Sequence, residues 1–303
     1  MAEAFLNTQR YAVVTGANKG IGLEICKQLA PRGIMVVLTA RDEKKGIEAQ
    51  EKLKDLDFSD KVVFHQLDVM DPNTIISISH FIQSEFGRLD ILVNNAGVSG
   101  VRVEGDALIL QELIIGSFFD RGKTTANGTV IETIEGAEEC LQTNYYGVKR
   151  ITEALIPLLQ LSDSPRIVNV SSGLGMLKFL SSKWATRALS DQENLTEEKI
   201  DEVVKNFLTS FKQGSLEGDN WPTQMSAYKV SKGAMNAYTR LIARKYPGFC
   251  INCVCPGFVR TDITCNQGLL SADEAAKGPV EIALMAHGGP SGLFFKQSEV
   301  SPF

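Results

Sequence analysis

The most informative stretch for the fold of this chain is Tyr11-Ala-Val-Val-Thr-Gly-Ala-Asn-Lys-Gly-Ile-Gly22. It begins as an apolar run of strand length and continues as a turn that contains three glycines. Residues Ile21–Ala30 then have the pattern of a helix, which Gly33 closes. Glycines between a buried strand and a helix let the backbone turn sharply and approach a phosphate closely. The stretch therefore predicts the first strand–turn–helix unit of an α/β fold with a phosphate-binding turn.

Strand-length apolar runs alternate with longer amphipathic segments along the rest of the chain. The runs are continuously rich in Val, Ile and Leu, which is typical of parallel strands buried on both faces. The expected strands are 11–15, 34–39, 62–67, 89–93, 166–171 and 249–254, and the expected helices are 21–30, 43–56, 72–86, 136–161 and 226–245. These repeated units predict a Rossmann-type, doubly wound parallel sheet with helices on both faces.

Two stretches interrupt this alternation. Ser99–Glu135 has several glycines and no clear period, whereas Lys178–Trp221 contains one expected helix, from about Thr196 to Phe211. Thr196 is a suitable N-cap for that helix. Because strands of the same sheet resume after each stretch, we interpret both as insertions, at about 99–135 and 178–221, into a single domain that spans 1–303.

Composition and charge narrow the class of protein. The 303-residue chain has 44% hydrophobic and 22% charged residues, which is ordinary for a globular protein. Its formal net charge of −5 disfavours binding to nucleic acid or to an anionic membrane. Residues 1–7 lack the features of a signal peptide, and the cysteines are few and fall partly in an expected buried strand. We therefore expect a cytoplasmic protein without a metal site.

The end of the second expected strand indicates which dinucleotide the glycine turn would bind. NAD-binding chains carry an acidic residue there, which holds the ribose 2′-hydroxyl. Here the strand ends in Thr39-Ala40-Arg41, and Arg41 together with Lys19 can hold a 2′-phosphate. Asp42 follows, and we expect its side chain to point outward. These residues favour NADP(H), and the alternative is that both cations are solvated surface charges.

Tyr228-Lys-Val-Ser-Lys232 carries a candidate acid–base pair. The two residues lie four positions apart in an expected helix and therefore share a face. We expect the ammonium of Lys232 to lower the pKa of the phenol, so that Tyr228 can donate a proton to a ketone oxygen. By itself this spacing occurs more often by chance on a solvated helix face.

Polar residues at the ends of three expected strands give the pair its context. Ser171 and Ser172 end the strand 166–171, Asn94-Asn-Ala-Gly97 follows the strand 89–93, and Pro256-Gly257 follows the strand 249–254. Sites on parallel sheets lie at the carboxyl ends of the strands. We therefore expect these groups to converge with Tyr228 on one rim of the sheet.

The motifs TGxxxGxG, NNAG, a strand-end serine, YxxxK and PG, in this order, resemble the short-chain dehydrogenase/reductase superfamily over nearly the whole chain. Stretches such as Phe64-His-Gln-Leu-Asp-Val69 and Gly289-Pro-Ser-Gly292 are similar to the plant subgroup of salutaridine reductase and the menthol and neomenthol dehydrogenases. The monomeric animal carbonyl reductases are more distant relatives. The resemblance implies an enzyme that transfers hydride from NADPH to a ketone carbon.

The resemblance also implies a role for each site residue. Tyr228 would be the proton donor, and Lys232 its partner and a ribose ligand. Ser172 would polarise the carbonyl, and Asn144 would hold a water in a proton relay behind Lys232. The residues implied in cofactor binding are Gly16, Asn18, Lys19, Gly20, Ile21, Gly22, Arg41, Asp68, Val69, Asn95, Ala96, Gly97, Tyr228, Lys232, Pro256, Gly257, Val259 and Thr261.

The long segment between Ser172 and Tyr228 is the main departure from the commoner superfamily members. In the resembling subgroup a similar insertion covers the helix face that other members use to oligomerise, and it also roofs the substrate pocket. The resemblance therefore implies a monomer whose partner is a small-molecule ketone or alcohol.

We predict an NADPH-dependent reductase that converts a bulky apolar ketone, such as a plant terpenoid or alkaloid, to a secondary alcohol. Two alternatives stay open. One is NADPH-dependent reduction of a conjugated C=C bond, as in isopiperitenone reductase, where the resemblance implies an acid in place of the tyrosine. The other is an inactive cofactor-binding regulatory protein, against which the complete set of Asn144, Ser172, Tyr228 and Lys232 argues.

Overall fold

The computed structural model describes residues 9–119 and 125–303. Residues 1–8, which include the stretch without signal-peptide features, and residues 120–124 of the first insertion lie outside the described part. The strands of the main sheet are β1 (Tyr11–Val14), β2 (Met35–Ala40), β3 (Val62–Gln66), β4 (Ile91–Asn94), β7 (Arg166–Val170), β8 (Cys250–Cys255), β9 (Phe294–Lys296) and β10 (Glu299–Ser301).

The order of the strands confirms a doubly wound sheet. In the described residues the order is β10-β9-β8-β7-β4-β1-β2-β3, and every neighbouring pair is parallel except β9 with β10. The chain starts in the middle, at β1, and continues outward to either side. The direction of winding changes between β1 and β4, and ligands of such sheets bind at that switch point.

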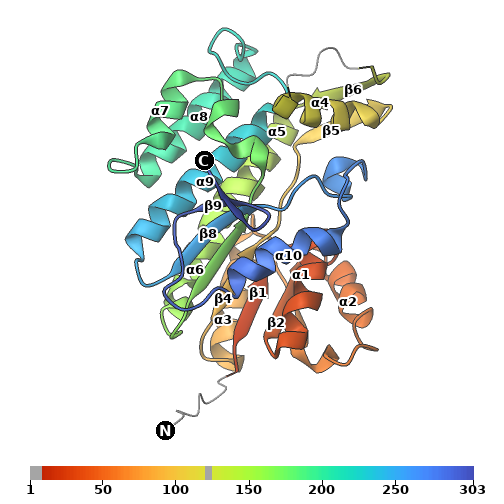
Figure 1. Cartoon of the computed structure of the whole chain (residues 1–303), viewed down its shortest axis with the longest axis vertical. Helices are drawn as coiled ribbons and strands as arrows, with labels where there is room; N and C mark the ends of the chain where they lie inside the picture. Colours follow the sequence, from red (N-terminus) through yellow and green to blue (C-terminus); the bar gives the residue numbers. More distant parts are fainter. Residues whose placement is uncertain (1–8, 120–124) are drawn as a thin grey trace.

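Helices cover both faces of the sheet (Figure 1). One face carries α1 (Gly20–Leu29), α2 (Glu43–Glu51) and α10 (Ala272–Ala283), and the other carries α3 (Pro72–Glu85), α6 (Val148–Leu159) and α9 (Ser226–Lys245). Successive strand residues alternate between the two cores: Val13 packs in the α3–α6–α9 core, and Val14 packs in the α1–α2–α10 core. The prediction of helices on both faces is therefore confirmed.

The first insertion forms a unit that the sequence does not predict. It consists of an antiparallel pair, β5 (Val101–Gly105) with β6 (Gly128–Glu132), and of α4 (Leu108–Phe119) between them. Apolar residues are spread around the circumference of α4, with Gln111, Glu112 and Ser117 among them, so its sequence shows no apolar face at the helical period. Figure 1 shows this unit at the end of the molecule away from the N-terminus.

The second insertion contributes α7 (Lys183–Ser190) and α8 (Glu197–Gln213). The expected helix is confirmed as α8, and its N-cap Thr196 accepts a hydrogen bond from Lys199 N. One face of α8 is buried in the core that contains α9. Asp201 of α8 accepts a hydrogen bond of 2.8 Å from the hydroxyl of Tyr145. This contact fixes α8 to the turn Gln142–Gly147, which directly precedes α6.

Several other elements differ from the prediction. The expected helix 136–161 is divided into α5 (Ile134–Leu141), a π-helical turn at Gln142–Gly147 and α6. A π-helical turn widens the helix locally and is frequent at functional sites. The expected helix 43–56 ends at Glu51. Helix α10, which contains Pro279, and the three-residue strands β9 and β10 are not predicted from the sequence.

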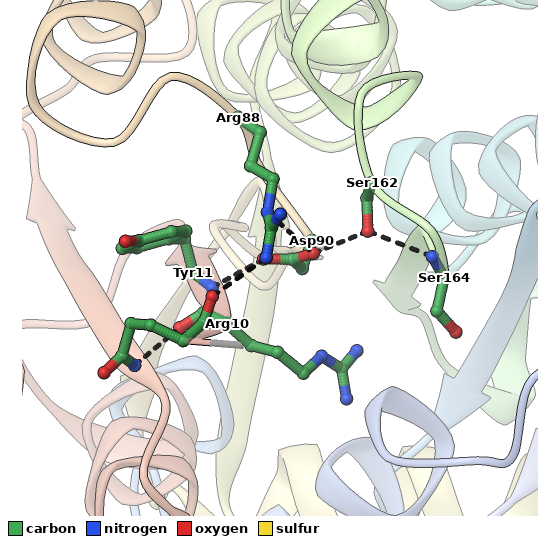
Figure 2. A network of polar contacts seen from close by, with 7 residues as sticks. Arg10, Tyr11, Arg88, Asp90, Ser162 and Ser164 are labelled. Carbon is green, nitrogen blue, oxygen red and sulfur yellow. Dashed lines mark hydrogen bonds and ion pairs between the residues drawn. The ribbon is translucent and has the colours of Figure 1, made fainter. Parts of the chain in front are cut away.

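At the amino-terminal edge of the strands, one carboxylate joins three segments (Figure 2). Asp90, just before β4, accepts hydrogen bonds from Tyr11 N at 2.8 Å and from Ser162 Oγ at 2.5 Å, and it lies 3.6 Å from Arg88 Nε. Burial lowers the pKa of the neighbouring Arg10, and the charge of Asp90 opposes that shift. This network anchors β1 beside β4 at the edge opposite the carboxyl ends.

Candidate active site

A cavity of about 710 Å³ opens at the carboxyl ends of the strands, at the switch point of the sheet. The segments that follow β1, β4, β7 and β8 all contribute to its walls. The cavity therefore occupies the place where the sequence predicts that polar strand ends converge.

The glycine turn forms a cradle at one end of this cavity. Gly16 and Gly20 have φ angles of +61° and +56°, which favour glycine, and a Cβ on Gly16 would lie 2.9 Å from Ala96 Cα. Lys19, the N-cap of α1, makes no side-chain capping bond, and the first turn contains no acidic residue. The first amides of α1 are thus available to an anion, and the turn fits a pyrophosphate.

Three cations line the part of the cavity beside β2: Lys19, Arg41 and Lys45. Arg41 Nη1 lies 3.3 Å from Glu139 Oε1, and Lys19 forms an ion pair with Asp262. The expectation that Asp42 points outward is only partly right. The residue lines the cavity, but its carboxylate caps α2 by accepting a hydrogen bond of 3.0 Å from Lys45 N. Since Lys45 Nζ lies 3.9 Å from Asp42 Oδ2, each of the three cations of this wall has a carboxylate nearby.

Tyr228 and Lys232 on α9 and Ser172 after β7 line the cavity together. Lys232 Nζ lies 5.8 Å from the centre of the Tyr228 ring and donates a hydrogen bond of 2.9 Å to Val170 O. The amino-terminal part of α9 thus presents both side chains to the end of β7, which confirms that they converge on the rim predicted from the sequence.

Asn144 lies behind the cavity wall, in the π-helical turn. Its side chain accepts a hydrogen bond from Val98 N and donates one to Val98 O, both at 2.9 Å. Gly97 separates it from the cavity, since a Cβ there would lie 3.1 Å from Asn144 Oδ1 and 3.6 Å from Lys232 Nζ. The structure therefore brings Asn144 next to Lys232, as expected, through the glycine of the NNAG motif.

The charge states at the site differ from the sequence expectation in one respect. Burial raises the pKa of Tyr228 above that of a free phenol, and a hydrogen bond with Ser172 offsets part of the shift. The net shift is therefore upward, opposite to the expected lowering by Lys232, because burial is its largest cause. Burial also lowers the pKa of Lys232, to about 8.

Nearly all the residues implied in cofactor binding line the cavity. The exception is Gly22, where a Cβ would lie 2.5 Å from Asn95 Nδ2 and 2.7 Å from Gly16 O, so its role is close packing beneath the turn. The sequence reasoning missed Lys45, although it lies one helical turn beyond Arg41 in an expected helix. Residues of the loop Asp262–Asn266 also line the cavity, within the segment 258–268 from which the sequence predicts pocket-lining residues.

The described residues contain neither a candidate metal site nor a candidate membrane-spanning helix. Over 9–119 and 125–303, no three His, Cys, Asp or Glu side chains are grouped so that they could hold a metal ion. Across the same ranges, no helix has the length and apolar character needed to cross a membrane.

Comparison with known proteins gives consistent matches. The short chain dehydrogenase family model matches residues 10–204. The chain is 54% identical to (+)-neomenthol dehydrogenase of Capsicum annuum over all of both chains, and 54% identical to (-)-isopiperitenone reductase of Mentha piperita over 96% of this chain and 97% of that protein. It is 33% identical to carbonyl reductase [NADPH] 1 of Rattus norvegicus over 96% of this chain and 98% of that protein.

A solved structure is equally similar. Salutaridine reductase from Papaver somniferum superimposes with a TM-score of 0.87 at 52% identity, over 95% of this chain and 99% of that chain. The resemblance inferred from the motifs, including the greater distance to the animal carbonyl reductases, is thereby confirmed.

Proposed function

The chain belongs to the short-chain dehydrogenase/reductase family, and on that premise we propose that it uses NADPH to reduce a bulky apolar ketone to a secondary alcohol. It is an oxidoreductase closely related to plant neomenthol dehydrogenase, salutaridine reductase and isopiperitenone reductase. The observation that carries the proposal is the arrangement of Tyr228, Ser172 and Lys232 on one wall of the cavity.

The choice of NADPH rests on the cations beside β2. Lys19, Arg41 and Lys45 line this wall, while the carboxylate of Asp42 is engaged in capping α2. A 2′-phosphate would bring two negative charges and several acceptor oxygens to these cations, whereas the free 2′-hydroxyl of NADH would bring no charge. The rat relative, carbonyl reductase [NADPH] 1, is named for its use of NADPH, which supports the same choice.

A bound nicotinamide would supply the hydride, and the side chains of this chain would handle the proton. Tyr228 is protonated at neutral pH, as any phenol is, and burial, which raises its pKa, keeps it so. It can then donate that proton to a ketone oxygen as the hydride arrives. The Ser172 hydroxyl would donate a hydrogen bond to the same oxygen. Lys232, when charged, would stabilise the phenolate that remains. Asn144 would hold a water behind Lys232 through which the phenol regains a proton.

The first insertion supports an apolar substrate. Residues of α4 such as Leu113, Ile114 and Ile115 are only half-buried, so part of their apolar surface faces solvent. At the end of α4, Phe118 lies against Gly173, where a Cβ would be 2.9 Å from Phe118 Cζ. An apolar helix therefore ends directly beside Ser172, and its burial against a ligand would be favourable.

We expect Tyr228→Phe to lower kcat for ketone reduction by at least about 100-fold, because it removes only the proton donor. The measurement is NADPH oxidation with a panel of cyclic ketones. Fluorescence titration with NADPH serves as the control, since the variant should bind the cofactor as the wild type does. Full activity in this variant would refute the mechanism.

A second candidate reaction is reduction of a conjugated C=C bond, which the 54% identity to isopiperitenone reductase favours. The presence of Tyr228 favours carbonyl reduction instead, since a phenol is placed to protonate oxygen. Product analysis with an α,β-unsaturated ketone separates the two: an allylic alcohol indicates C=O reduction, and a saturated ketone indicates C=C reduction.

A further inference from the structure

The start of α9, the helix that carries Tyr228, is capped by a residue from the first insertion. The N-cap Met225 is in the left-handed region, with φ +48°, and its side chain makes no capping bond. Glu132, the last residue of β6, takes over this task from 94 positions away. Its carboxylate accepts Ser226 N at 2.9 and 3.0 Å, Ser226 Oγ at 2.6 Å and Ala227 N at 3.4 Å.

These contacts fall on the turn that presents the phenol. Tyr228 follows Ala227 directly, so any shift of the first turn of α9 moves the phenol with it. The first amides of a helix have no partner inside the helix, and a carboxylate there is favoured both as an acceptor and by the helix dipole. Glu132 therefore fixes the turn that positions Tyr228, although it does not line the cavity.

The same insertion also contacts the turn that carries Ser172. Phe118 lies against Gly173, next to Ser172, and its ring meets Phe179 edge to face at 5.1 Å. The unit β5–α4–β6 thus touches both the Ser172 turn and the α9 turn. Through these contacts the insertion can set the distance between the phenol and the serine.

We propose that Glu132 is a positioning residue for ketone reduction, which acts through Ser226 to hold Tyr228 in place relative to Ser172. The inference rests on the function proposed above. It assigns to the first insertion a part in the chemical step.

The chain offers a matched control in Glu274. Its carboxylate accepts the amide and the hydroxyl of Ser271, both at 2.8 Å, at the start of α10. In both cases a carboxylate accepts the amide and the hydroxyl of a serine at the start of a helix, although Glu274 belongs to the helix that it caps and Glu132 does not. Only the first of these helices carries a residue of the proposed reaction.

The test compares Glu132→Ala, Glu132→Gln and Glu274→Gln by steady-state kinetics with a ketone that the wild type reduces. We expect Glu132→Ala to lower kcat about 10- to 100-fold, the loss that misplacement by about an ångström causes. The KM for NADPH should stay close to that of the wild type. Glu132→Gln should recover part of kcat, since an amide oxygen still accepts a hydrogen bond, and Glu274→Gln should leave kcat unchanged.

Amide hydrogen exchange gives a readout that needs no substrate. Residues 226–228 should exchange faster in the Glu132 variants than in the wild type and in Glu274→Gln. Equal kcat values for Glu132→Gln and Glu274→Gln, with unchanged exchange in residues 226–228, would overturn the proposal. If the wild type reduces no ketone but the exchange result holds, the proposed function fails while the capping role stands.

Discussion

Lys232 loses its proton at an unusually low pH, because burial lowers its pKa to about 8. Below this pH the side chain is cationic and can both bind a ribose and stabilise the phenolate of Tyr228. Above it the amine is neutral, so both interactions weaken. The residue therefore limits the alkaline range in which the enzyme can work.

We expect kcat/KM for NADPH to fall with one-proton dependence as pH rises through about 8, since this parameter reports the free enzyme. Rate measurements at a series of alkaline pH values test this. Lys232→Arg should remove the decline, whatever its residual rate, because a guanidinium stays charged throughout. A wild-type profile that stays level across this range would contradict the assignment.

Arg41 is the side chain on which the proposed preference for NADPH depends most directly. Replacing it by alanine removes one charged hydrogen-bonding group from the 2′-phosphate site, and we expect the KM for NADPH to rise about tenfold. The KM for NADH should not change. Arg32→Ala is a suitable control, since Arg32 is an exposed arginine at the end of α1 and lies outside the cavity. A loss of affinity for both cofactors would argue against the assignment.

At the level of single residues, the sequence predicts a position when a local motif constrains it. The glycine turn and the YxxxK pair are of this kind, because strand–turn–helix geometry and the helical period place them directly. Glu132 has no such signal. Its contact with Ser226 depends on how the insertion folds back over 94 positions, which no local pattern encodes.

At the level of elements, the same distinction applies. The amphipathic helix α8 and its N-cap Thr196 are predictable because one face is buried and the other is solvated. Helix α4 is not predictable because its apolar residues do not gather on one face. The π-helical turn is not predictable because the residues around Asn144 continue a helical pattern. Such a turn is a matter of tertiary packing, which the period alone cannot show.

For the whole molecule, the burial of α8 bears on the oligomeric state. Ile200, Val203 and Phe207 of α8 are fully buried in the core that contains α9. The face of α9 that packs against α8 is therefore already covered within the chain. We therefore propose that the protein is a monomer.

Sedimentation velocity over a range of concentrations tests this proposal, and we expect the mass of one chain at each concentration. The measurement should be repeated with saturating NADPH, because ligand binding can shift an association equilibrium. A stable dimer or tetramer under either condition would show that another surface mediates assembly.

The strand order also has a consequence for biosynthesis. β1 is central in the finished sheet, and its two neighbours, β2 and β4, are both translated within the first 94 residues. The phosphate cradle and the cations beside β2 belong to that early segment, whereas Tyr228 and Lys232 leave the ribosome only with the last quarter of the chain. Because chains fold progressively as they emerge, the strands β1, β2 and β4 can pair first. The residues proposed to transfer the proton join the fold last.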